Sequence, residues 1–453
     1  MSSLADRIRG VLGAPHPEAG SPGEPQLPGE SRVPGESRVP NPESRDLSPL
    51  GGAWREDCFV VERRWEPTAQ HGHEEIGALA ERLDEAAGEA VLFAGGAARA
   101  PFVFFDLETT GLSGGAGTLA FVVGCAWFES DGAFRTRQFL LTRYADERPL
   151  LAAVSGELAR AGALVSFNGK SFDAPLLETR YLFHRLDWVG GRRPHIDVLH
   201  PARQFWKRHP CDGARAFETE SSGSLVALER QIVGARRVGD VPGFEIPGRY
   251  FQFLRSGDAR PLGAVLEHNR LDLITLAALT ARLLHLTRTG HEAARDAREA
   301  LALGRVYARA HRQAQGALSQ SKGGGLDARA CAAFRHAVAL SDRGAKSAST
   351  ALVKMDSLRV LALALRRARQ FVEAAACWRQ LLDIRECPPH LTREATEALA
   401  VHHEHRARDL AAAKAFALRS LETGLDPARM DAARHRLARL ERKMTGRRPG
   451  SLL

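Results

Sequence analysis

The sequence contains no apolar run that could cross a membrane, because no segment approaches the roughly 18 uninterrupted apolar residues that a spanning helix needs. The stretch from Met1 to Pro15 has charges within its apolar part, so it lacks the continuous apolar centre of a secretory signal peptide. From these two absences we expect a cytoplasmic protein that makes no contact with membranes.

Cysteine is scarce and scattered, since the 453 residues include only six cysteines and no C-x-x-C pair. This spacing favours neither a disulfide framework nor a thiolate zinc site, so we expect reduced thiols. The six are Cys58, Cys125, Cys211, Cys331, Cys377 and Cys387.

Basic side chains are in excess, with 63 Lys and Arg against 54 Asp and Glu, a formal net charge of +9 and a pI near 9.6. Such an excess suits a polyanionic partner, because lysines and arginines that neutralise phosphates release counterions. A composition rich in Arg and Ala produces the same excess without such a partner, so charge alone leaves both interpretations open.

At 453 residues the chain exceeds a single hydrophobic core, and its composition changes along its length. Residues 1–57 are rich in Pro, Gly and Ser and repeat the hexapeptide GESRVP, so we expect a disordered region. Residues 58–99 form a short lead-in segment, with a strand expected at 58–61 and a helix near 76–87.

Residues 100–290 alternate β-prone and helical stretches and predict one α/β domain. The order of three strands, a helix, a strand and a helix is that of the ribonuclease-H-like fold, a mixed sheet flanked by helices, among other α/β options. The strands are expected at 101–111, 119–128, 133–141 and 163–167, and the helices at 147–160, 174–186 and 264–284.

Residues 291–444 are rich in Ala, Leu and Arg and predict helices alone. An apolar pattern recurs with an offset of 39 residues, from Phe371 and Trp378 to Leu410 and Ala417. Helix pairs at this spacing indicate a tetratricopeptide-like (TPR-like) repeat region, and an irregular helical bundle is the alternative. The Arg-rich helices could extend an electrostatic track for nucleic acid, or equally present a groove for a protein partner. The rest of the chain, 445–453, is expected to be a disordered tail.

Two carboxylates mark the end of the strand expected at 101–111. Asp106 and Glu108 are two residues apart, and side chains at i and i+2 of a strand share one face. Paired hard oxygen ligands are those that Mg²⁺ and Mn²⁺ require. The alternative is a strand exit with two solvated acids.

Two further acidic elements follow in the chain. Asp173 ends the sequence NGKSFD directly before a helix, where it could also serve simply as a helix N-cap. His268 and Asp272 are four residues apart in the helix expected at 264–284 and therefore share a face. An Asp inside the apolar stretch LDLITLAAL needs an explanation, and an ordinary His–Asp pair is the simpler one.

The three elements, D-x-E, N-x₃-F-D and H-x₃-D, occur in the order that is typical of the DEDD superfamily of exonucleases, which they resemble. More closely, FFDLETTGL, VSFNGKSFDAPLL and LEHNRLDLITLA resemble the YprB-type ribonuclease-H-like proteins, which are related to the exonuclease domain of B-family DNA polymerases. The resemblance covers about residues 100 to 290.

The resemblance implies that Asp106, Glu108, Asp173 and Asp272 hold two divalent cations, Mg²⁺ or Mn²⁺, and that His268 is the general base. It also implies a 3′→5′ exonuclease acting on DNA or RNA, at a single-stranded 3′ end. The histidine branch of that superfamily usually has H-x₄-D, whereas three residues separate His268 from Asp272, as in the tyrosine branch.

Five more residues are candidates for contacts with the substrate. The glycine-rich stretch after Glu108 could bring backbone N–H groups to a phosphate, and a plain strand connection is the alternative. Lys170 could bind a phosphate or be an exposed loop lysine. The candidates are Thr109, Gly111, Asn168, Lys170 and Phe172.

The stretch ARQFWKRH (202–209) mixes basic and aromatic side chains, which could bind single-stranded nucleic acid by charge and stacking. A helix with a buried Phe–Trp stripe is the alternative. Nearby, His195, Asp197 and His200 have none of the spacings of a tetrahedral metal site.

These patterns together predict a metal-dependent nuclease. The alternative is a catalytically idle nucleic-acid-binding or scaffold protein whose helical repeats recruit partners. Four converging carboxylates argue against an idle site, because they repel one another when no metal is bound.

Overall fold

The computed structural model describes residues 45–111, 117–207, 223–316, 323–344, 347–421 and 427–445. Of the region expected to be disordered, 1–57, residues 1–44 lie outside these ranges, and so do residues 446–453 of the expected tail. Residues 45–57 differ from that prediction, because they contain the 3-10 turn Ser48–Leu50 and the strand Ala53–Arg55. Within them, no helix combines the length and the apolar character needed to span a bilayer. The five cysteines in these ranges are all free.

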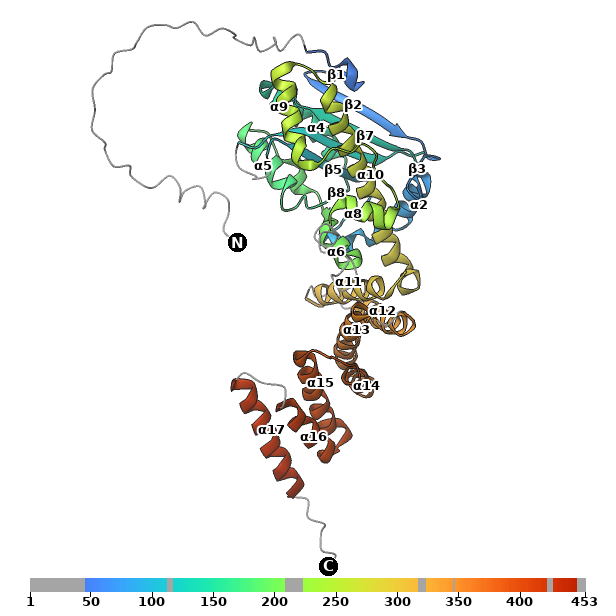
Figure 1. Cartoon of the computed structure of the whole chain (residues 1–453), viewed down its shortest axis with the longest axis vertical. Coiled ribbons are helices and arrows are strands. Elements are labelled where there is room, and N and C mark those ends of the chain that lie inside the picture. Colours follow the sequence, from blue (N-terminus) through green and yellow to red (C-terminus); the bar gives the residue numbers. More distant parts are fainter. Residues whose placement is uncertain are drawn as a thin grey trace, which may run out of the picture. The chain divides into compact units, whose positions relative to one another are not determined.

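A mixed sheet of seven strands has the order β1-β2-β7-β6-β5-β8-β9 (Figure 1). Neighbouring strands pair antiparallel from β1 to β5, whereas β8 and β9 run parallel to β5. The strands are β1 (Ala53–Arg55), β2 (Cys58–Trp65), β5 (Phe102–Thr109), β6 (Ala120–Phe128), β7 (Phe134–Leu140), β8 (Ala163–Ser166) and β9 (His195–Asp197), with a separate hairpin of β3 (Gln70–His71) and β4 (Glu74–Glu75). The predicted α/β class with a mixed sheet is confirmed.

Helices flank this sheet, and the longest of them, α10, has 30 residues. They are α2 (Ile76–Glu85), α3 (Val91–Ala94), α4 (Glu147–Ala159), α5 (Asp173–Phe183), α6 (Leu199–Trp206), α8 (Leu225–Leu228), α9 (Ile246–Ser256) and α10 (Arg260–Thr289). Short 3-10 turns are η2 (Ser48–Leu50), η3 (Ala87–Ala90), η4 (Tyr144–Asp146), η5 (Val189–Arg192), η8 (Gly243–Glu245) and η9 (His291–Ala293), and η7 (Glu229–Val233) and η10 (His403–Ala407) are π-helical.

Two strands of the sheet come from segments that the sequence analysis placed outside the α/β domain. Strand β1 lies before residue 58, and β2 continues past the expected 58–61 to Trp65. The apolar residues Cys58 to Val61 are buried, and the polar remainder of β2 stays extended because it pairs with β7 up to Trp65↔Phe134. The domain therefore begins before the boundary that the sequence suggested at residue 100.

The sheet buries apolar side chains on both faces, and β5 shows how. Phe102 and Phe104 belong to a core with α2 and the C-terminal half of α10. Val103 and Phe105 belong to a second core, with α4 and α5. This alternation follows from the two-residue period of a strand, so the even-numbered positions that follow Phe104 also face the α10 side.

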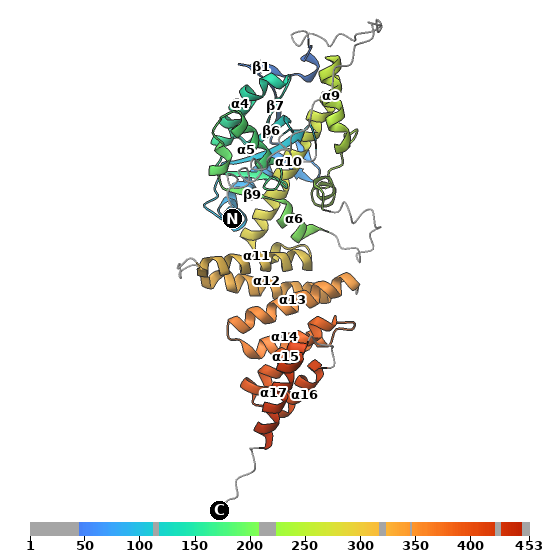
Figure 2. The same ribbon diagram turned by 90° about the vertical axis from the view of Figure 1, so that its left-hand side faces the viewer.

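After residue 290 the described chain is entirely helical, and successive helices pack on one another from α11 to α17 (Figure 2). These helices are α11 (Ala297–Gly316), α12 (Gly323–Arg343), α13 (Ala348–Arg367), α14 (Phe371–Leu382), α15 (Pro389–His402), α16 (Leu410–Leu421) and α17 (Pro427–Thr445). Helices α14 and α16 each have 12 residues and begin 39 residues apart, from 371 to 410, which matches the offset in the sequence. The TPR-like assignment stays a prediction.

The helical region shares a hydrophobic core with the α/β domain. One continuous core joins α2, β5 and α10 to helices α11 to α15. At the junction, Trp206 of α6 donates its indole N–H to Oε1 of Glu299 on α11 over 2.8 Å. The predicted Phe–Trp stripe is therefore real, because Phe205 and Trp206 are both buried.

Candidate active site

The D-x-E pair lies where the even-numbered face of β5 reaches the end of the strand. Asp106 is partly exposed and Glu108 is buried, and both precede a shift in the pairing register between Glu108 and Thr109. Both follow Phe102 and Phe104 on the face that α10 covers. The strand therefore presents two carboxylates to α10.

Asp106 is held in place by an asparagine of α10. The amide Nδ2 of Asn269 donates to Oδ2 of Asp106 over 2.8 Å, and its Oδ1 accepts from Gln138 of β7 over 2.9 Å. Gly124 on β6 makes room for this amide, since a Cβ there would lie 2.1 Å from Oδ1 of Asn269. Asn269 was not proposed from the sequence; it is fully buried, which only the structure shows.

Asp173 is brought to the site by a tight loop between β8 and α5. It is the first residue of α5 and is buried, and Phe172 rather than Asp173 occupies the N-cap position. The loop is anchored by Asp197 of β9, which accepts the backbone N–H groups of Asn168 and Lys170 over 2.8 and 3.1 Å. Asn168 has a φ of 69°, a left-handed conformation that asparagine tolerates better than most residues.

Close packing of this loop requires glycine at position 169. A Cβ there would lie 2.2 Å from Oγ of Ser166 and 3.0 Å from Oδ2 of Asp173. The loop can therefore approach the Asp173 carboxylate only without a side chain at this position.

His268 and Asp272 lie on one face of α10, as their spacing predicted. Nε2 of His268 is 3.5 Å from Oδ2 of Asp272, and its Nδ1 is 2.7 Å from Oδ1 of Asp240. A carboxylate only accepts hydrogen bonds, so Nδ1 carries the proton of that bond, and Nε2 of the neutral ring keeps a lone pair. Asp240, which the sequence analysis did not consider, thus directs the basic nitrogen toward Asp272.

Arg237 is a buried cation beside these groups, and no sequence pattern predicted it. Its Nη2 donates to Oδ1 of Asp272 over 2.5 Å and its Nε to Oε2 of Glu229 over 2.6 Å, while only 4% of its side chain is exposed. Burial lowers the pKa of Arg237, but the charges of Asp272 and Glu229 outweigh it and raise the pKa overall. Arg237 therefore stays charged and occupies one oxygen of Asp272.

The remaining carboxylates influence one another strongly. Burial and then the charges of Asp272 and Asp173 raise the pKa of Asp106 and that of Glu108 well above their ordinary values. Burial and the charge of Asp197 raise the pKa of Asp173 to about 7. Acids from β5, the β8–α5 loop and α10 are therefore close enough together to repel one another.

The donor chemistry of these residues fits a divalent cation. Asp106, Glu108, Asp173 and Asp272 offer carboxylate oxygens, the ligands that Mg²⁺ and Mn²⁺ take, and a cation would relieve their repulsion. In the part of the chain that the structure describes, no three His, Cys, Asp or Glu side chains already form a metal-binding group. Closing a cage around an ion would therefore require these side chains to draw together.

The five candidate substrate contacts have different surroundings. The hydroxyl of Thr109 donates a hydrogen bond to the carbonyl of Gly111, so its proton is already bonded within the same turn. Residues 112–116, which follow in the glycine-rich stretch, lie outside the described ranges. Asn168 and Lys170 are exposed beside the buried Asp173, while Phe172 is half-buried. Of the five, Asn168 and Lys170 have side chains that a ligand at this edge could reach.

Comparison with known proteins agrees with this arrangement. Residues 103–284, from β5 into α10, match the family model described as the RNase H superfamily. This part of the chain is therefore similar to RNase H superfamily domains and has their mixed-sheet fold. The chain is also 31% identical over 274 residues to YprB of Bacillus subtilis (strain 168), an uncharacterized protein, with 58% of this chain and 62% of that protein covered. The match thus spans less than two thirds of YprB's length.

All the acidic residues of the candidate site lie within the matched range, residues 103–284. The matched range includes Asp106 and Glu108 near its start and Asp272 near its end. Asp240 and Arg237 fall within it as well, in the connection between η7 and η8. Strands β1 and β2 and the helices beyond α10 lie outside it.

Proposed function

We propose that the RNase H-like domain hydrolyses phosphodiester bonds of nucleic acid with the help of two divalent cations, as a 3′→5′ exonuclease. One observation carries the proposal: α10, which carries His268 and Asp272, is joined to the acids of β5 by the hydrogen bond from Asn269 to Asp106, over 2.8 Å, and the charges of Asp272 and Asp173 raise the pKa of Asp106. Burying such a set without cations costs stability, and cation binding offsets that cost. The polarity rests on the resemblance to DEDD exonucleases.

In this proposal the carboxylates of Asp106, Glu108, Asp173 and Asp272 hold Mg²⁺ or Mn²⁺. When bound, such cations supply Lewis-acid stabilisation of the charge that develops on the attacked phosphodiester. Arg237 already occupies Oδ1 of Asp272, so that residue offers its Oδ2. Asn269 likewise occupies Oδ2 of Asp106, which leaves Oδ1 of that carboxylate for a cation.

His268 is the proposed general base. With its Nδ1 proton directed to Asp240, its Nε2 can accept a proton from an attacking water. The spacing H-x₃-D places Nε2 3.5 Å from Oδ2 of Asp272, so the base lies beside a proposed metal ligand. The shorter spacing is therefore compatible with a base at this position.

The test compares the purified parent with an Asp106→Asn/Asp173→Asn variant on end-labelled single-stranded DNA and RNA. We expect the parent to shorten the strands from the 3′ end with Mg²⁺ or Mn²⁺, the variant to lose at least a hundredfold in rate, and chelator to abolish cleavage. The control is Asp84→Asn/Asp383→Asn, which changes two exposed acids by the same charge and should cleave like the parent. Equal cleavage by parent and variant, or cleavage in chelator, would refute the proposal.

The alternative is an idle domain that binds nucleic acid and serves as a scaffold, with partners on the helical region. The Arg237–Asp272 ion pair favours it, because a cation of the protein itself occupies one carboxylate oxygen. In the same experiment, this alternative predicts binding of the labelled strands without cleavage by any metal. A cytoplasmic location remains a prediction from the sequence.

A further inference from the structure

A groove lined by four arginines lies in the helical region, and we call it the arginine groove. Arg305, Arg309 and Arg312 of α11 and Arg367 of α13 line a hollow of about 400 Å³. Its remaining lining is largely apolar, and Gln204 of α6 also contributes to it. The groove thus lies where the helical region meets the RNase H-like domain.

The spacing of the arginines makes a continuous row of positive charge. Positions 305, 309 and 312 are separated by four and three residues, so they share one face of α11. The row extends about 10 Å along the helix axis at 1.5 Å per residue. That length corresponds to roughly three steps of 3.4 Å between the phosphates of one stacked strand.

Most of this charge is not neutralised by the residues that the structure describes. Arg305 is paired with Asp356 over 3.0 Å, on an exposed surface where such a pair is weak. For Arg309, Arg312 and Arg367, the described residues provide no ion-pair partner, and all three side chains are exposed. Four guanidinium groups around one apolar floor suit a ligand with several phosphates and flat bases, because guanidinium binds phosphate in a fork and stacks on rings.

The groove is connected to the candidate active site by a short element. Asp197 anchors the loop that carries Asp173 and is followed within two residues by α6. Gln204, at the edge of the groove, lies seven residues after Asp197, which is about 10 Å along a helix. The segment that anchors the loop of Asp173 therefore leads directly to the edge of the arginine groove.

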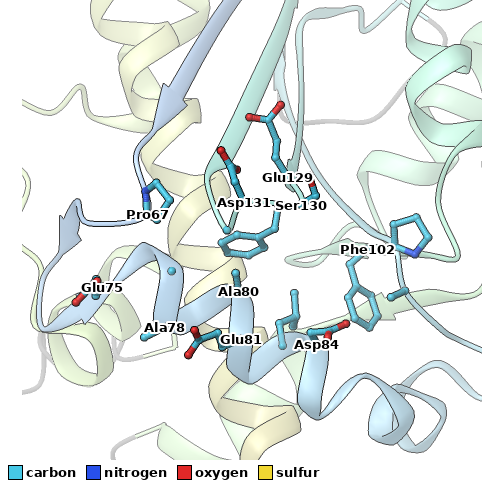
Figure 3. A pocket seen from close by; sticks show the side chains of 16 residues that line it. Pro67, Glu75, Ala78, Ala80, Glu81, Asp84, Phe102, Glu129, Ser130 and Asp131 are labelled. Carbon is cyan, nitrogen blue, oxygen red and sulfur yellow. The ribbon is translucent and has the colours of Figure 1, made fainter.

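The charge of a second hollow restricts where such a strand can run. A hollow of about 850 Å³ lies between α2 and the β6–β7 turn, and acidic side chains such as Glu81, Asp84 and Asp131 surround it (Figure 3). Phosphates would be repelled there. Of these two hollows, only the arginine groove is suited to a polyanion.

From these observations we propose that the arginine groove binds the sugar–phosphate backbone of a single-stranded nucleic acid whose 3′ end is in the RNase H-like domain. The inference rests on the proposed function for the identity of its ligand, and it adds the expectation that the substrate is a strand long enough to span both places. An acidic polypeptide is the competing occupant, and the test includes it.

The test measures binding in chelator, where no cleavage interferes, with a long labelled single strand and with one of about 4 nucleotides, the lower end of usual site sizes. We expect the variant Arg309→Glu/Arg312→Glu/Arg367→Glu to bind the long strand roughly tenfold or more weakly than the parent. The slope of log K against log salt concentration should fall by about 2, because each of three lost phosphate contacts contributes about 0.7 to it. Binding of the short strand should not change.

The matched control is Arg343→Glu/Arg385→Glu/Arg419→Glu, which makes the same change of charge at three exposed arginines away from the groove. We expect this variant to bind the long strand like the parent. Melting curves of both variants establish that they are folded.

The inference is overturned if the groove variant binds the long strand like the parent, or if both triple variants lose affinity equally. It is also overturned if poly-glutamate occupies the groove and the long strand does not. A parent that never cleaves but loses binding in the groove variant would refute the proposed nuclease and leave the groove proposal standing.

Discussion

At the scale of single residues, the contact between Asp240 and His268 has the most direct consequence. Asp240 lies outside the three acidic motifs, yet its Oδ1 is 2.7 Å from Nδ1 of His268. It also touches Arg237 through its second oxygen, over 3.4 Å. One carboxylate thus orients both the proposed base and the cation that holds Asp272.

We therefore expect Asp240→Asn to lower kcat by roughly 10- to 100-fold, as the loss of a partner that orients a ligand or base does, with little change in KM. The amide can donate to Nδ1, so it permits the tautomer with its proton on Nε2. Steady-state kinetics on a labelled oligonucleotide measures the effect, and Asp258→Asn, which changes a partly exposed acid paired with Arg260, is the control. An unchanged kcat, or a change in KM alone, would contradict a positioning role.

The acids also make stability depend on pH. Because the folded-state pKa values of Asp106, Glu108 and Asp173 are raised, the folded protein binds more protons than the unfolded one above about pH 4, the ordinary carboxyl range. The stability that these three groups contribute at low pH is therefore lost as pH rises through their folded-state pKa values. For Asp173 that pKa is about 7. Burial lowers the pKa values of His71 and His195 to about 4, so these two groups make stability rise with pH. Their effect is confined to the range below pH 6.5, the ordinary pKa of histidine.

Between pH 6.5 and 8 we expect the melting temperature of the metal-free protein to fall, and Mn²⁺ to raise it more at pH 8 than at pH 6.5. Thermal melts in chelator and in Mn²⁺ measure both. The Asp106→Asn/Asp173→Asn variant should show a flatter pH profile and a smaller response to metal. A parent profile that rises over this range would contradict the assigned pKa shifts.

The sequence predicted some residues of this site but not others, and the division has a physical reason. Asp106, Glu108, Asp173, His268 and Asp272 stand in short local patterns whose geometry a strand or a helix fixes. Arg237, Asp240 and Asp197 meet the site only through the folded chain, from segments with no periodic pattern. Their roles as hydrogen-bond partners, of side chains for Arg237 and Asp240 and of backbone N–H groups for Asp197, could not be inferred from spacing. Whether the five predicted residues perform the assigned chemistry stays a prediction.

At the scale of elements, the packing of α10 on the sheet controls the geometry of the site. Asn269 of α10 reaches Asp106 on β5 only because Gly124 of β6 has no side chain, since a Cβ would lie 2.1 Å from its amide oxygen and 2.9 Å from Leu273. A methyl group at position 124 would therefore push α10 away from β5. The helix carries His268 and Asp272 with it.

We expect Gly124→Ala to destabilise the protein by about 1–3 kcal/mol, the usual cost of overpacking a core, and to weaken metal binding. Denaturant unfolding and Mn²⁺ titration measure the two effects. Gly156→Ala is the control, because Gly156 is exposed on α4 with open space at its Cβ, and alanine there should stabilise the helix by up to about 1 kcal/mol. Equal stability of the two variants would show that the Gly124–Asn269 contact is not tight.

Elements with a clear apolar pattern in the sequence were predictable. Segments that are extended only because they pair with a neighbouring strand were not. Strand β6 was expected at 119–128 and is found at Ala120–Phe128, because its apolar run is buried on both sides. Strand β2 was expected to end at residue 61, yet it extends to Trp65 through pairing with β7. The polar residues Glu62 to Arg64 carry no strand pattern, and only their partner strand holds them extended.

At the scale of the whole molecule, the shared core makes the RNase H-like domain depend on the helices that follow it. Phe205 and Trp206 of α6 belong to the same core as Leu303 of α11, and Glu299 of α11 receives bonds from both Trp206 and Arg282. Removing α11 would expose apolar surface on α6 and leave Arg282 without that partner. The boundary near residue 290 is thus a change of architecture within one continuous core.

We expect a chain ending at residue 289 to be less stable than the full chain, since each large apolar side chain brought to the surface costs about 1.5–3 kcal/mol. Its melting temperature should fall and its binding of an apolar dye should rise. A chain ending at residue 421, which lacks only α17 and the tail, should change much less, because the small core beneath α17 is separate. Equal melting of the 1–289 chain and the full chain would show that the domain folds independently.

The two edges of the sheet affect how the protein behaves in concentrated solution. Both outermost strands, β1 and β9, have only three residues, so each leaves few backbone groups for a strand of another molecule to pair with. Long exposed edges promote the addition of strands between molecules, and short ones limit it. The protein should therefore resist fibril formation on storage, even though Trp54 on β1 is 52% exposed.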